Sequence, residues 1–477
     1  MSFHDETVTK RLLKLSSLDK VLRYYYKGRA KVKDTNLCLR DLWELDNQVY
    51  FHTTIHASGY ITCKRDKRGE KSVTHPVFLK LSPSIYLPPE VLEPTCAMYR
   101  FHKEQRIYTE LIKDFTKYQL EMTPDCPIRM RFDSAFPTCY GTRPSIPNER
   151  TNMKHCGLTI LENVYALPSN KCFMTLDSRT ELSDEIFLAV LDKMTILHAV
   201  SLVIKYRNPQ LYSEKLPLLQ SSAEYASRIQ LPSQAREVCY RYLSKQVMKL
   251  DRVQEFNHYL EESRNIRINE NEKWMGFVHG MPCQFNFRWE RQTENIIDIK
   301  FLDLQYALHR HVLSDLAFLL LTTAPKSLFL EKYLLFTRRY HRKFVFHLRF
   351  LGFSDDELES YEEFEKQLKL CLRKELLRSV MMLKYLSCIA GTQEIMRPLA
   401  TWPSLPTFFH TQLQMDDKLF ISRCLAIFKS LRKLRILPPL ARLSCLFGSD
   451  TEDEDSCSGH TSPEPAYGGV YIPKKKH

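Results

Sequence analysis

Two short segments hold the residues best suited to chemistry. The segment 277–286, FVHGMPCQFN, contains a histidine, a glycine and an asparagine. Some two dozen residues after that histidine, Asp303 lies in IKFLDLQ, where apolar residues flank its carboxylate. A carboxylate in such surroundings is costly to bury unless it is paired, capped by hydrogen bonds or coordinated to a metal ion.

The first segment looks like a phosphotransferase catalytic loop. Phosphoryl transfer needs a cation for the nucleotide phosphates, carboxylate or amide ligands for magnesium, and a group that orients the acceptor hydroxyl. Met281 occupies the position where such a loop carries an aspartate. Because a thioether cannot accept the proton of a hydroxyl, the presumed general base is missing.

The elements before residue 168 predict a small β-rich part with one long helix. Residues 8–28 have apolar residues at helical spacing and a glycine stop, which indicates an amphipathic helix. Residues 37–83 alternate apolar and polar residues between turn signals, which predicts antiparallel strands. Residues 96–118 have a helical period, and the segments FPTCYG and CGLTILENV read as two further strands.

The rest of the chain is predicted to be mainly helical. Helical period dominates to about residue 443, interrupted by the strand-like segments WMGFVHG and IIDIKFLDL. We therefore expect an α+β protein with two lobes, a small antiparallel β-rich N-lobe and a large mainly α-helical C-lobe. The expected divisions are an N-terminal helical extension over 1–36, the N-lobe over 37–164, the C-lobe over 165–446 and a disordered tail over 447–477. The tail's acidic block is interpreted as solubilising, with phosphorylation by an acid-directed kinase as the alternative.

The composition is that of an ordinary globular protein. The net charge of +13 favours an anionic ligand, but the basic residues are scattered, so a solvated basic surface explains the charge as well. No nucleic-acid recognition motif accompanies them, and no nucleic-acid partner is expected. The fourteen cysteines lack paired spacing, and the start MSFHDETVTK lacks a secretory pattern. We expect a cytoplasmic protein with reduced thiols and no membrane span, because no run reaches the roughly 18 apolar residues that a span needs.

Eight segments in order carry a specific resemblance: FLKLSP, FHKEQRIYTELI, PTCYG, LTILENV, LDKMTILHAVS, FVHGMPCQFN, IKFLDLQ and LSDLAFLLLT. Their order resembles the ecdysteroid kinase-like (CHK kinase-like) family of arthropods, which is related to choline kinases and aminoglycoside phosphotransferases. The resemblance extends from about residue 41 to 433. It implies the two-lobed protein-kinase-like fold.

The resemblance also implies a nucleotide site for ATP. Lys80 falls where the family's strand lysine contacts the α- and β-phosphates, and Glu104 matches the helix glutamate that pairs with this lysine. Glu162 and Asn163 match the segment between the lobes and would offer backbone groups to an adenine. Without the resemblance, each of these residues is explained by surface charge or by strand packing.

The resemblance assigns the remaining residues to the metal site and the loop. Asp303 and Asn286 match the family's Mg²⁺ ligands, and His279 helps to position the loop in which Met281 replaces the catalytic aspartate. Asp315 is expected to accept hydrogen bonds from the loop backbone. Two further residues, His198 and Cys283, are expected to be core packing and an inert structural thiol.

Three functions remain open from the sequence. The first is a catalytically impaired small-molecule kinase that still binds nucleotide, and Met281 favours it. The second is an active ATP-dependent kinase that phosphorylates a hydroxyl of a sterol or another unidentified apolar alcohol. The third is a non-catalytic scaffold.

A second departure from the family, in the segment ELDNQVYFHTTI, removes the expected glycine and adds Asp46 near the phosphates.

Overall fold

The structure is a computed structural model that forms two compact units, Met1–Pro438 and Pro439–His477. It describes residues 15–25, 30–40, 56–65, 72–82, 97–144, 157–164, 173–174, 182–220, 250–269, 273–292, 295–324, 328–387 and 417–437. All of these belong to the first unit. The expected tail and the segment ELDNQVYFHTTI lie outside the described residues.

An antiparallel five-stranded sheet forms the N-terminal part of the described chain. Its order is β1-β2-β3-β5-β4, with bounds Ala30–Arg40, His56–Arg65, Val73–Leu81, Leu158–Glu162 and Cys139–Arg143. The predicted antiparallel strands are thus confirmed. The first strand begins at Ala30, earlier than expected, because its polar residues conceal the alternation on which the prediction depends.

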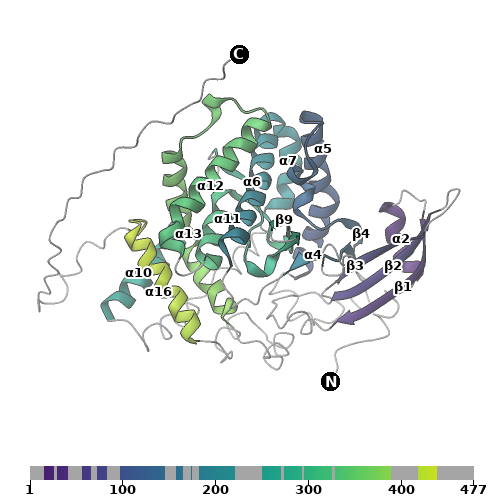
Figure 1. Cartoon of the computed structure of the whole chain (residues 1–477), viewed down its shortest axis with the longest axis horizontal. Helices are drawn as coiled ribbons and strands as arrows, with labels where there is room; N and C mark the ends of the chain where they lie inside the picture. Colours follow the sequence, from purple (N-terminus) through teal and green to yellow (C-terminus); the bar gives the residue numbers. More distant parts are fainter. Residues whose placement is uncertain are drawn as a thin grey trace, which may run out of the picture. The chain divides into compact units, whose positions relative to one another are not determined.

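The helix α2 (Leu15–Tyr25) packs on this sheet, as Figure 1 shows. Its apolar side chains join one buried cluster with residues of the strands: Leu18, Val21, Leu22, Ile61, Cys63, Val77, Leu79, Leu81, Tyr140, Leu158 and Ile160. The predicted amphipathic helix is confirmed over these eleven residues. Its burial in the cluster explains why its apolar residues recur at helical spacing.

One long helical run follows the third strand. It comprises α4 (Ala97–Arg106), the π turn η2 (Ile107–Leu111) and α5 (Ile112–Met122). At the π turn the Ile112 N–H donates to the carbonyl of Ile107, so the turn contains one residue more than an α-helical turn. Two short 3₁₀ turns then lead to β4: η3 (Ile128–Met130) and η4 (Asp133–Ala135).

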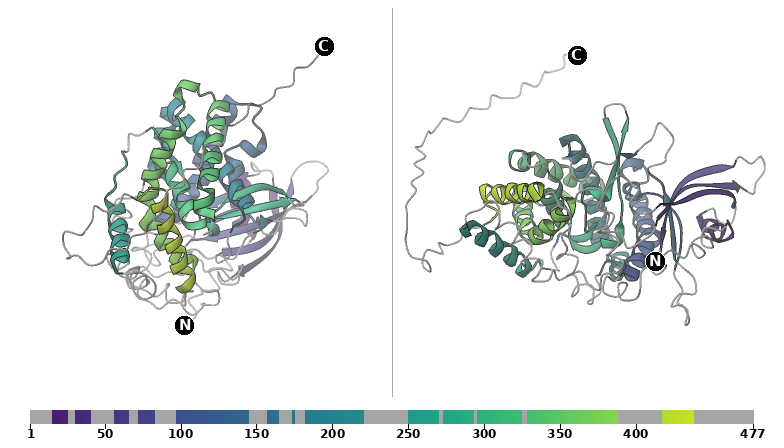
Figure 2. Two further views of the ribbon diagram at one scale, coloured as in Figure 1. Left: turned by 60° about the vertical axis from the view of Figure 1, so that its left-hand side comes forward. Right: turned by 90° about the horizontal axis from the view of Figure 1, so that it is seen from below.

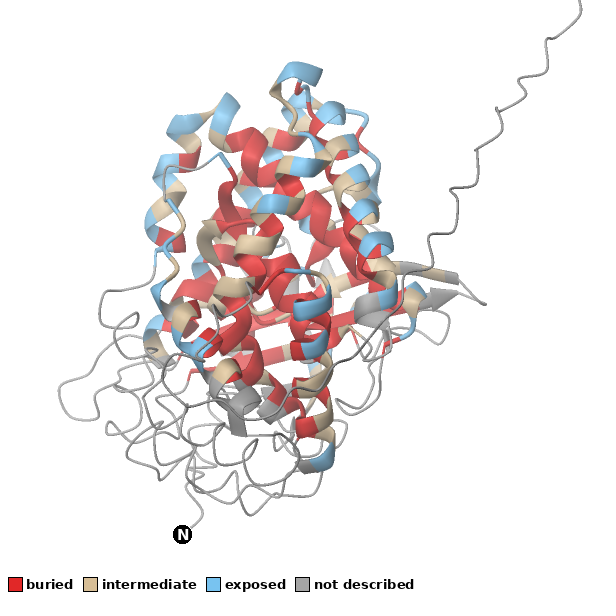
Figure 3. Cartoon of the chain, turned by 90° about the vertical axis from the view of Figure 1, so that its left-hand side faces the viewer, coloured by how far each residue is buried: buried red, intermediate tan, exposed pale blue. Residues whose placement is uncertain are grey.

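Helices dominate the remaining described chain, as predicted. Their bounds are α6 Asp184–Arg207, α7 Pro209–Leu219, α10 Leu250–Asn265, α11 Leu313–Thr323, α12 Leu328–Phe350, α13 Tyr361–Leu386 and α16 Asp417–Lys433, with the 3₁₀ turn η7 at Asp355–Glu357. α6 packs on α12, and α11 packs on α13. Figure 3 shows buried positions along the inner faces of these helices. The chain therefore has the mixed helical and antiparallel composition of the α+β class.

Two small antiparallel sheets lie among the helices. One pairs β7 (Met275–Val278) with β10 (Leu308–His311), and the other has the order β6-β8-β9, with bounds Phe173–Met174, Phe287–Gln292 and Asn295–Phe301. Figure 2 shows β8 and β9 as a hairpin. The two strand-like segments of the prediction are β7 and β9. Their partners β8 and β10 were not predicted, because charged residues or histidines occupy half or more of each strand.

Among the described helices, α6 alone is long and apolar enough to cross a membrane by length and composition. This differs from the expectation that no run reaches the apolar length of a span. However, 83% of the apolar window is buried inside the fold. Burial on all sides explains the composition, because a helix surrounded by protein has no polar face.

Two buried histidines make the fold sensitive to acid. Burial lowers the pKa of His311 to about 3 and that of His347 to about 4. Both pKa values lie below the value of about 6.5 in the unfolded chain. The contribution of these histidines to the free energy of unfolding is therefore complete above pH 6.5 and declines as the pH falls toward 4. We expect the free energy of unfolding to fall by about 3 kcal/mol per pH unit from these two groups.

Urea unfolding at pH 7, 6 and 5 measures this slope. His347→Asn should reduce the slope by about 1.4 kcal/mol per pH unit. The matched control is His258→Asn, because His258 is exposed. If both variants kept the wild-type slope, the assignment to His347 would be wrong.

Candidate active site

Three charged side chains from distant parts of the chain meet in one buried cluster. Lys80 lies near the end of β3, and its Nζ donates to Oε1 and Oε2 of Glu104 on α4, at 2.7 and 2.9 Å. It also donates to Oδ1 of Asp303, at 3.2 Å. All three side chains are buried. One hydrogen bond thus joins Lys80 to Asp303, which lies 223 residues later in the sequence.

The cluster contains two carboxylates and one ammonium group, so its formal charge is −1 when all three are ionised. Burial alone would lower the pKa of Lys80, but Glu104 and Asp303 outweigh this effect and raise it. Burial raises the pKa of Glu104 despite the opposing effect of Lys80. Lys80 therefore stays protonated, and the cluster favours an additional cation.

Asp303 occupies a strained backbone position. Its φ of 66° and ψ of 59° lie in the left-handed region, which residues with a side chain rarely adopt. Nε2 of Gln305 donates to both carboxylate oxygens of Asp303 at 2.8 Å, and the Leu304 N–H donates to Oε1 of Glu104 at 3.1 Å. These bonds stabilise a conformation of the kind that is concentrated at functional sites.

The loop after β7 is held by Asp315, which lies in the first turn of α11. The backbone N–H groups of His279 and Gly280 donate to its two carboxylate oxygens, at 2.6 and 2.9 Å. Burial alone would raise the pKa of Asp315, but hydrogen bonds, first among them that of His198, lower it. The expectation that Asp315 accepts hydrogen bonds from this loop is confirmed.

The hydrogen bonds of His279 fix its neutral tautomer. Its Nε2 lies 2.7 Å from the carbonyl of Leu302 and must donate, while its Nδ1 accepts from the Met281 N–H at 3.3 Å. Burial lowers the pKa of His279, which agrees with an uncharged ring. His279 therefore joins the loop to the residue before Asp303.

Met281 lies in a loop whose geometry depends on backbone atoms. Its carbonyl accepts from Nδ2 of Asn286 at 2.9 Å and from the Cys283 N–H at 2.9 Å. The Leu302 N–H donates to the carbonyl of Asn286, which places Asn286 beside the strand that ends at Asp303. None of these hydrogen bonds involves the side chain of Met281.

The other two predicted nucleotide-site residues lie at the end of β5. The N–H of Glu162 donates to the carbonyl of Thr138, and the N–H of Asn163 donates to that of Pro76. Oε2 of Glu162 accepts from the Thr138 N–H at 3.0 Å. β5 pairs directly with β3, so these residues belong to the same sheet as Lys80. The N–H groups of Glu162 and Asn163 are thus both engaged within the fold.

Asp303 and Asn286 have the chemistry that Mg²⁺ prefers. A carboxylate and an amide oxygen are hard oxygen ligands, and Mg²⁺ in nucleotide sites uses one or two carboxylates together with phosphate oxygens and waters. The excess negative charge of the Lys80 cluster agrees with such an ion. In the described part of the chain, no group of three or more His, Cys, Asp or Glu side chains could hold a metal without other ligands. The oxygen ligands that Asp303 and Asn286 provide thus fit the preference of Mg²⁺.

A family model agrees with this arrangement. The model of the ecdysteroid kinase-like family matches residues 60–353, more than half of the chain. The chain belongs to the ecdysteroid kinase-like family. The match includes Lys80, Glu104, Met281 and Asp303, and it is narrower than the resemblance drawn from 41 to 433. No curated protein gave a match.

Three contacts of this ecdysteroid kinase-like site were not predicted. Gln305 binds Asp303 and was visible as an amide two residues along the chain. Arg378 of α13 donates to the carbonyl of Gly280 at 2.5 Å, although nothing in the sequence connects it to the loop. His198, expected to be core packing, is buried, but it also contacts Asp315 at 3.3 Å through Nε2.

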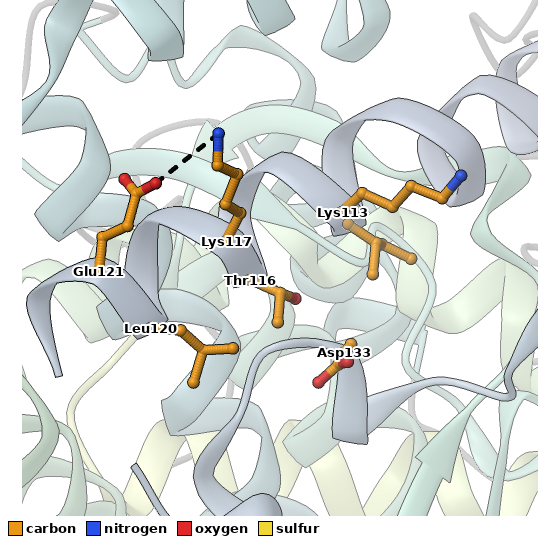
Figure 4. Close-up of a pocket in the computed structure, with 7 residues that line it drawn as sticks. Lys113, Thr116, Lys117, Leu120, Glu121 and Asp133 are labelled. Carbon is orange, nitrogen blue, oxygen red and sulfur yellow. Dashed lines mark ion pairs between the residues drawn. The ribbon is translucent and has the colours of Figure 1, made fainter. Parts of the chain in front are cut away.

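A separate groove of about 520 Å³ lies on α5 (Figure 4). Lys113, Thr116, Lys117 and Asp133 are among its lining residues, and Lys117 pairs with Glu121 at 3.7 Å. No lining residue belongs to the Lys80 cluster. This groove is therefore distinct from the candidate active site.

Gly280 allows the tight turn of the loop that follows β7. Its φ is +84°, and a Cβ atom at this position would lie 2.0 Å from the carbonyl oxygen of Tyr306. We expect Gly280→Ala to lower the free energy of unfolding by about 2–4 kcal/mol, from positive-φ strain and from the clash. Urea unfolding measures this effect.

Gly352→Ala is the matched control. Gly352 has a similar φ of +91°, but the nearest atom to its Cβ would be Cε of Met122 at 3.9 Å. This variant should lose only about 1–2 kcal/mol, from the strain alone. Equal losses in the two variants would contradict a close approach of Tyr306 to Gly280.

Proposed function

We propose that this chain is a small-molecule kinase-like protein that binds ATP but transfers phosphate poorly. In this proposal the five-stranded sheet with α2, α4 and α5 is the N-lobe of a two-lobed protein-kinase-like fold, and the part after residue 164 is the C-lobe. The observation that carries the proposal is Met281 in a loop that is otherwise assembled. Membership in the ecdysteroid kinase-like family supports phosphotransfer chemistry. A cytoplasmic location is part of the same proposal.

The nucleotide site is proposed around Lys80. Its ammonium group is charged and held by Glu104 and Asp303, so it is positioned before any ligand arrives. A fixed cation can hold phosphate oxygens without further ordering of a flexible side chain. Glu162 ends the strand beside β3 and Asn163 directly follows it, and backbone groups of this segment would meet the adenine.

Asp303 and Asn286 would hold Mg²⁺ in this proposal. The bound ion would neutralise phosphate charge as it develops during transfer. His279 and Asp315 keep the loop in place through its backbone. The acceptor hydroxyl, from a sterol or another apolar alcohol, would meet a thioether at position 281. It would therefore lack the general-base assistance that typically contributes about 10²–10⁴ in rate.

An active kinase is the second candidate. The observation in its favour is the complete contact set of Lys80, Glu104 and Asp303. Because the transition state of phosphoryl transfer is largely dissociative in most analyses, loss of a base does not by itself abolish turnover. A magnesium-dependent turnover that Asp303→Asn removes would favour this candidate over an impaired protein.

A thermal-shift titration with ATP and magnesium tests the nucleotide proposal. A ligand that binds only the folded chain raises the melting temperature, and saturation at 100 times the dissociation constant adds about 2.7 kcal/mol. We expect a shift with ATP and magnesium in the wild type. No shift at millimolar nucleotide would reject ATP binding and leave a non-catalytic scaffold.

A further inference from the structure

Both polar atoms of the Gly280 backbone are bound to charged side chains. Its N–H donates to Oδ1 of Asp315 at 2.9 Å, and its carbonyl accepts from Nη1 of Arg378 at 2.5 Å. Gly280 directly precedes Met281, whose N–H donates to Nδ1 of His279 at 3.3 Å. Arg378 therefore holds the oxygen of the peptide bond that leads into position 281, and His279 holds its nitrogen.

The peptide bond on the other side of Met281 is held as well. The carbonyl of Met281 accepts from Nδ2 of Asn286 and from the Cys283 N–H, each at 2.9 Å. Because a peptide bond is planar, the two planes that flank an α-carbon determine the direction of its Cα–Cβ bond. The contacts of His279, Asn286 and Cys283 lie within the loop. The contact of Arg378 reaches the loop from α13 and holds it against another element.

The guanidinium group of Arg378 is itself fixed by its neighbours. Its Nε forms an ion pair with Oε2 of Glu375, three residues earlier on α13, at 2.7 Å. Nη2 of Arg310, on β10, forms an ion pair with Oε1 of the same carboxylate at 2.5 Å. The guanidinium group also lies 4.3 Å from the ring centroid of Phe318 on α11. Because the side chain of Glu375 is fully buried, salt screens these ion pairs little.

Glu375 connects the loop to the strand in front of it. Arg310 belongs to β10, which pairs with β7 in the register Arg310↔Gly276, and β7 leads directly into the loop. A closed chain of contacts thus runs from β7 through β10, Glu375 and Arg378 to the carbonyl of Gly280. A hydrogen bond from a charged donor is stronger than one from a neutral donor, so the guanidinium group is well suited to hold this carbonyl.

We propose that Arg378 is a positioning residue that directs the side chain at position 281 toward the acceptor hydroxyl. This role rests on the proposed function, in which that side chain faces the acceptor. Arg378 acts through the carbonyl of Gly280 and not by contact with the acceptor. Its planar guanidinium group presents donors in a rigid fork, so Nε can face Glu375 while Nη1 binds the carbonyl.

Hydrogen exchange of the full chain, resolved to single amides by NMR, tests this proposal without any turnover. The reporters are the N–H groups of Gly280 and Cys283, which lie on the two sides of position 281. They donate to Asp315 and to the carbonyl of Met281. In Arg378→Gln we expect the protection of both reporters to fall by about tenfold or more relative to amides of α6, because a hydrogen bond from a charged donor is lost.

Two further variants separate positioning from general stability. Arg373→Gln is the matched control, because Arg373 lies on the same helix with similar exposure and pairs with Glu262 of α10. It should leave both reporters as protected as in the wild type. Arg378→Lys keeps the positive charge and remains informative if Arg378→Gln does not fold. It should also lose protection, because lysine lacks the fork that joins Glu375 to the carbonyl. Wild-type protection in either Arg378 variant, or an equal loss in Arg373→Gln, would overturn the proposal.

A kinetic measurement connects Arg378 to phosphate transfer. In the Met281→Asp background, Arg378→Gln should lower kcat by about 10- to 100-fold and leave the KM for ATP unchanged, because a misdirected group impairs the chemical step alone. A purely structural role would not produce this separation of kcat from KM. An equal kcat with and without Arg378→Gln would overturn the proposal. If Met281→Asp itself shows no turnover, the proposed function fails, and the exchange measurement still decides the role of Arg378.

Discussion

Lys80→Met is expected to lower the free energy of unfolding by about 3–5 kcal/mol and to remove the thermal shift caused by ATP and magnesium. The stability effect follows from charge, because the variant leaves Glu104 and Asp303 buried together without a cation. The binding effect follows from the loss of the only ammonium group in this cluster. Urea unfolding and the ATP titration measure the two effects separately.

Two variants test the electrostatic origin of this loss. Adding Glu104→Gln to Lys80→Met should recover part of the stability, because one uncompensated carboxylate is then neutral. The matched control is Lys117→Met. The side chain of Lys117 is 77% exposed, so the change should lie within about 0.5 kcal/mol. A loss in Lys80→Met that Glu104→Gln deepens would show that packing, not charge, dominates.

Met281→Asp is expected to raise the rate of phosphate transfer by about 10²–10⁴, which is the usual contribution of a general base. The loop should accept the aspartate, because backbone atoms and the side chains of His279 and Asn286 define its geometry. Met281 is half-buried, so a carboxylate there retains contact with water. The measurement is ADP release from ATP with a panel of apolar alcohols.

The control for this gain is Met281→Asn, which has nearly the shape of aspartate but cannot accept a proton as a base. It should remain at the wild-type rate. Adding Asp303→Asn to Met281→Asp should remove the gain, because the proposed metal ligand is then lost. High turnover in the unmodified chain, unchanged by Met281→Asp, would refute the proposal of impaired catalysis.

Elements with a strong hydrophobic periodicity could be predicted from the sequence, whereas strands rich in charged residues could not. The strand of Lys80 and the helix of Glu104 have clear alternation or helical period, and the resemblance then placed the two residues as partners. β8 was missed because FRWERQ places charged residues where a strand is expected to be apolar. Phe287 of β8 pairs with Phe301 of β9. The apolar residues of β8 therefore face those of β9, which explains why the strand is stable.

The contacts that hold the site depend on the folded backbone. The left-handed conformation of Asp303 and the close approach of Tyr306 to Gly280 have no signature in single residues. Arg378 reaches the loop from 98 residues away, and only the packing of α13 on α11 brings it there.

The π turn η2 determines where this helical run can change its length. Each residue of an α-helix advances the rotation by about 100°, so a deletion outside this turn but between Glu104 and Phe115 would turn Glu104 relative to the buried face of α5. Removing one residue within Ile107–Leu111 would instead convert the wide turn into a regular one and leave both faces in place. An alignment of related chains should therefore place any single-residue gap of this helix at η2, and such a gap would be compatible with an intact Lys80–Glu104 pair.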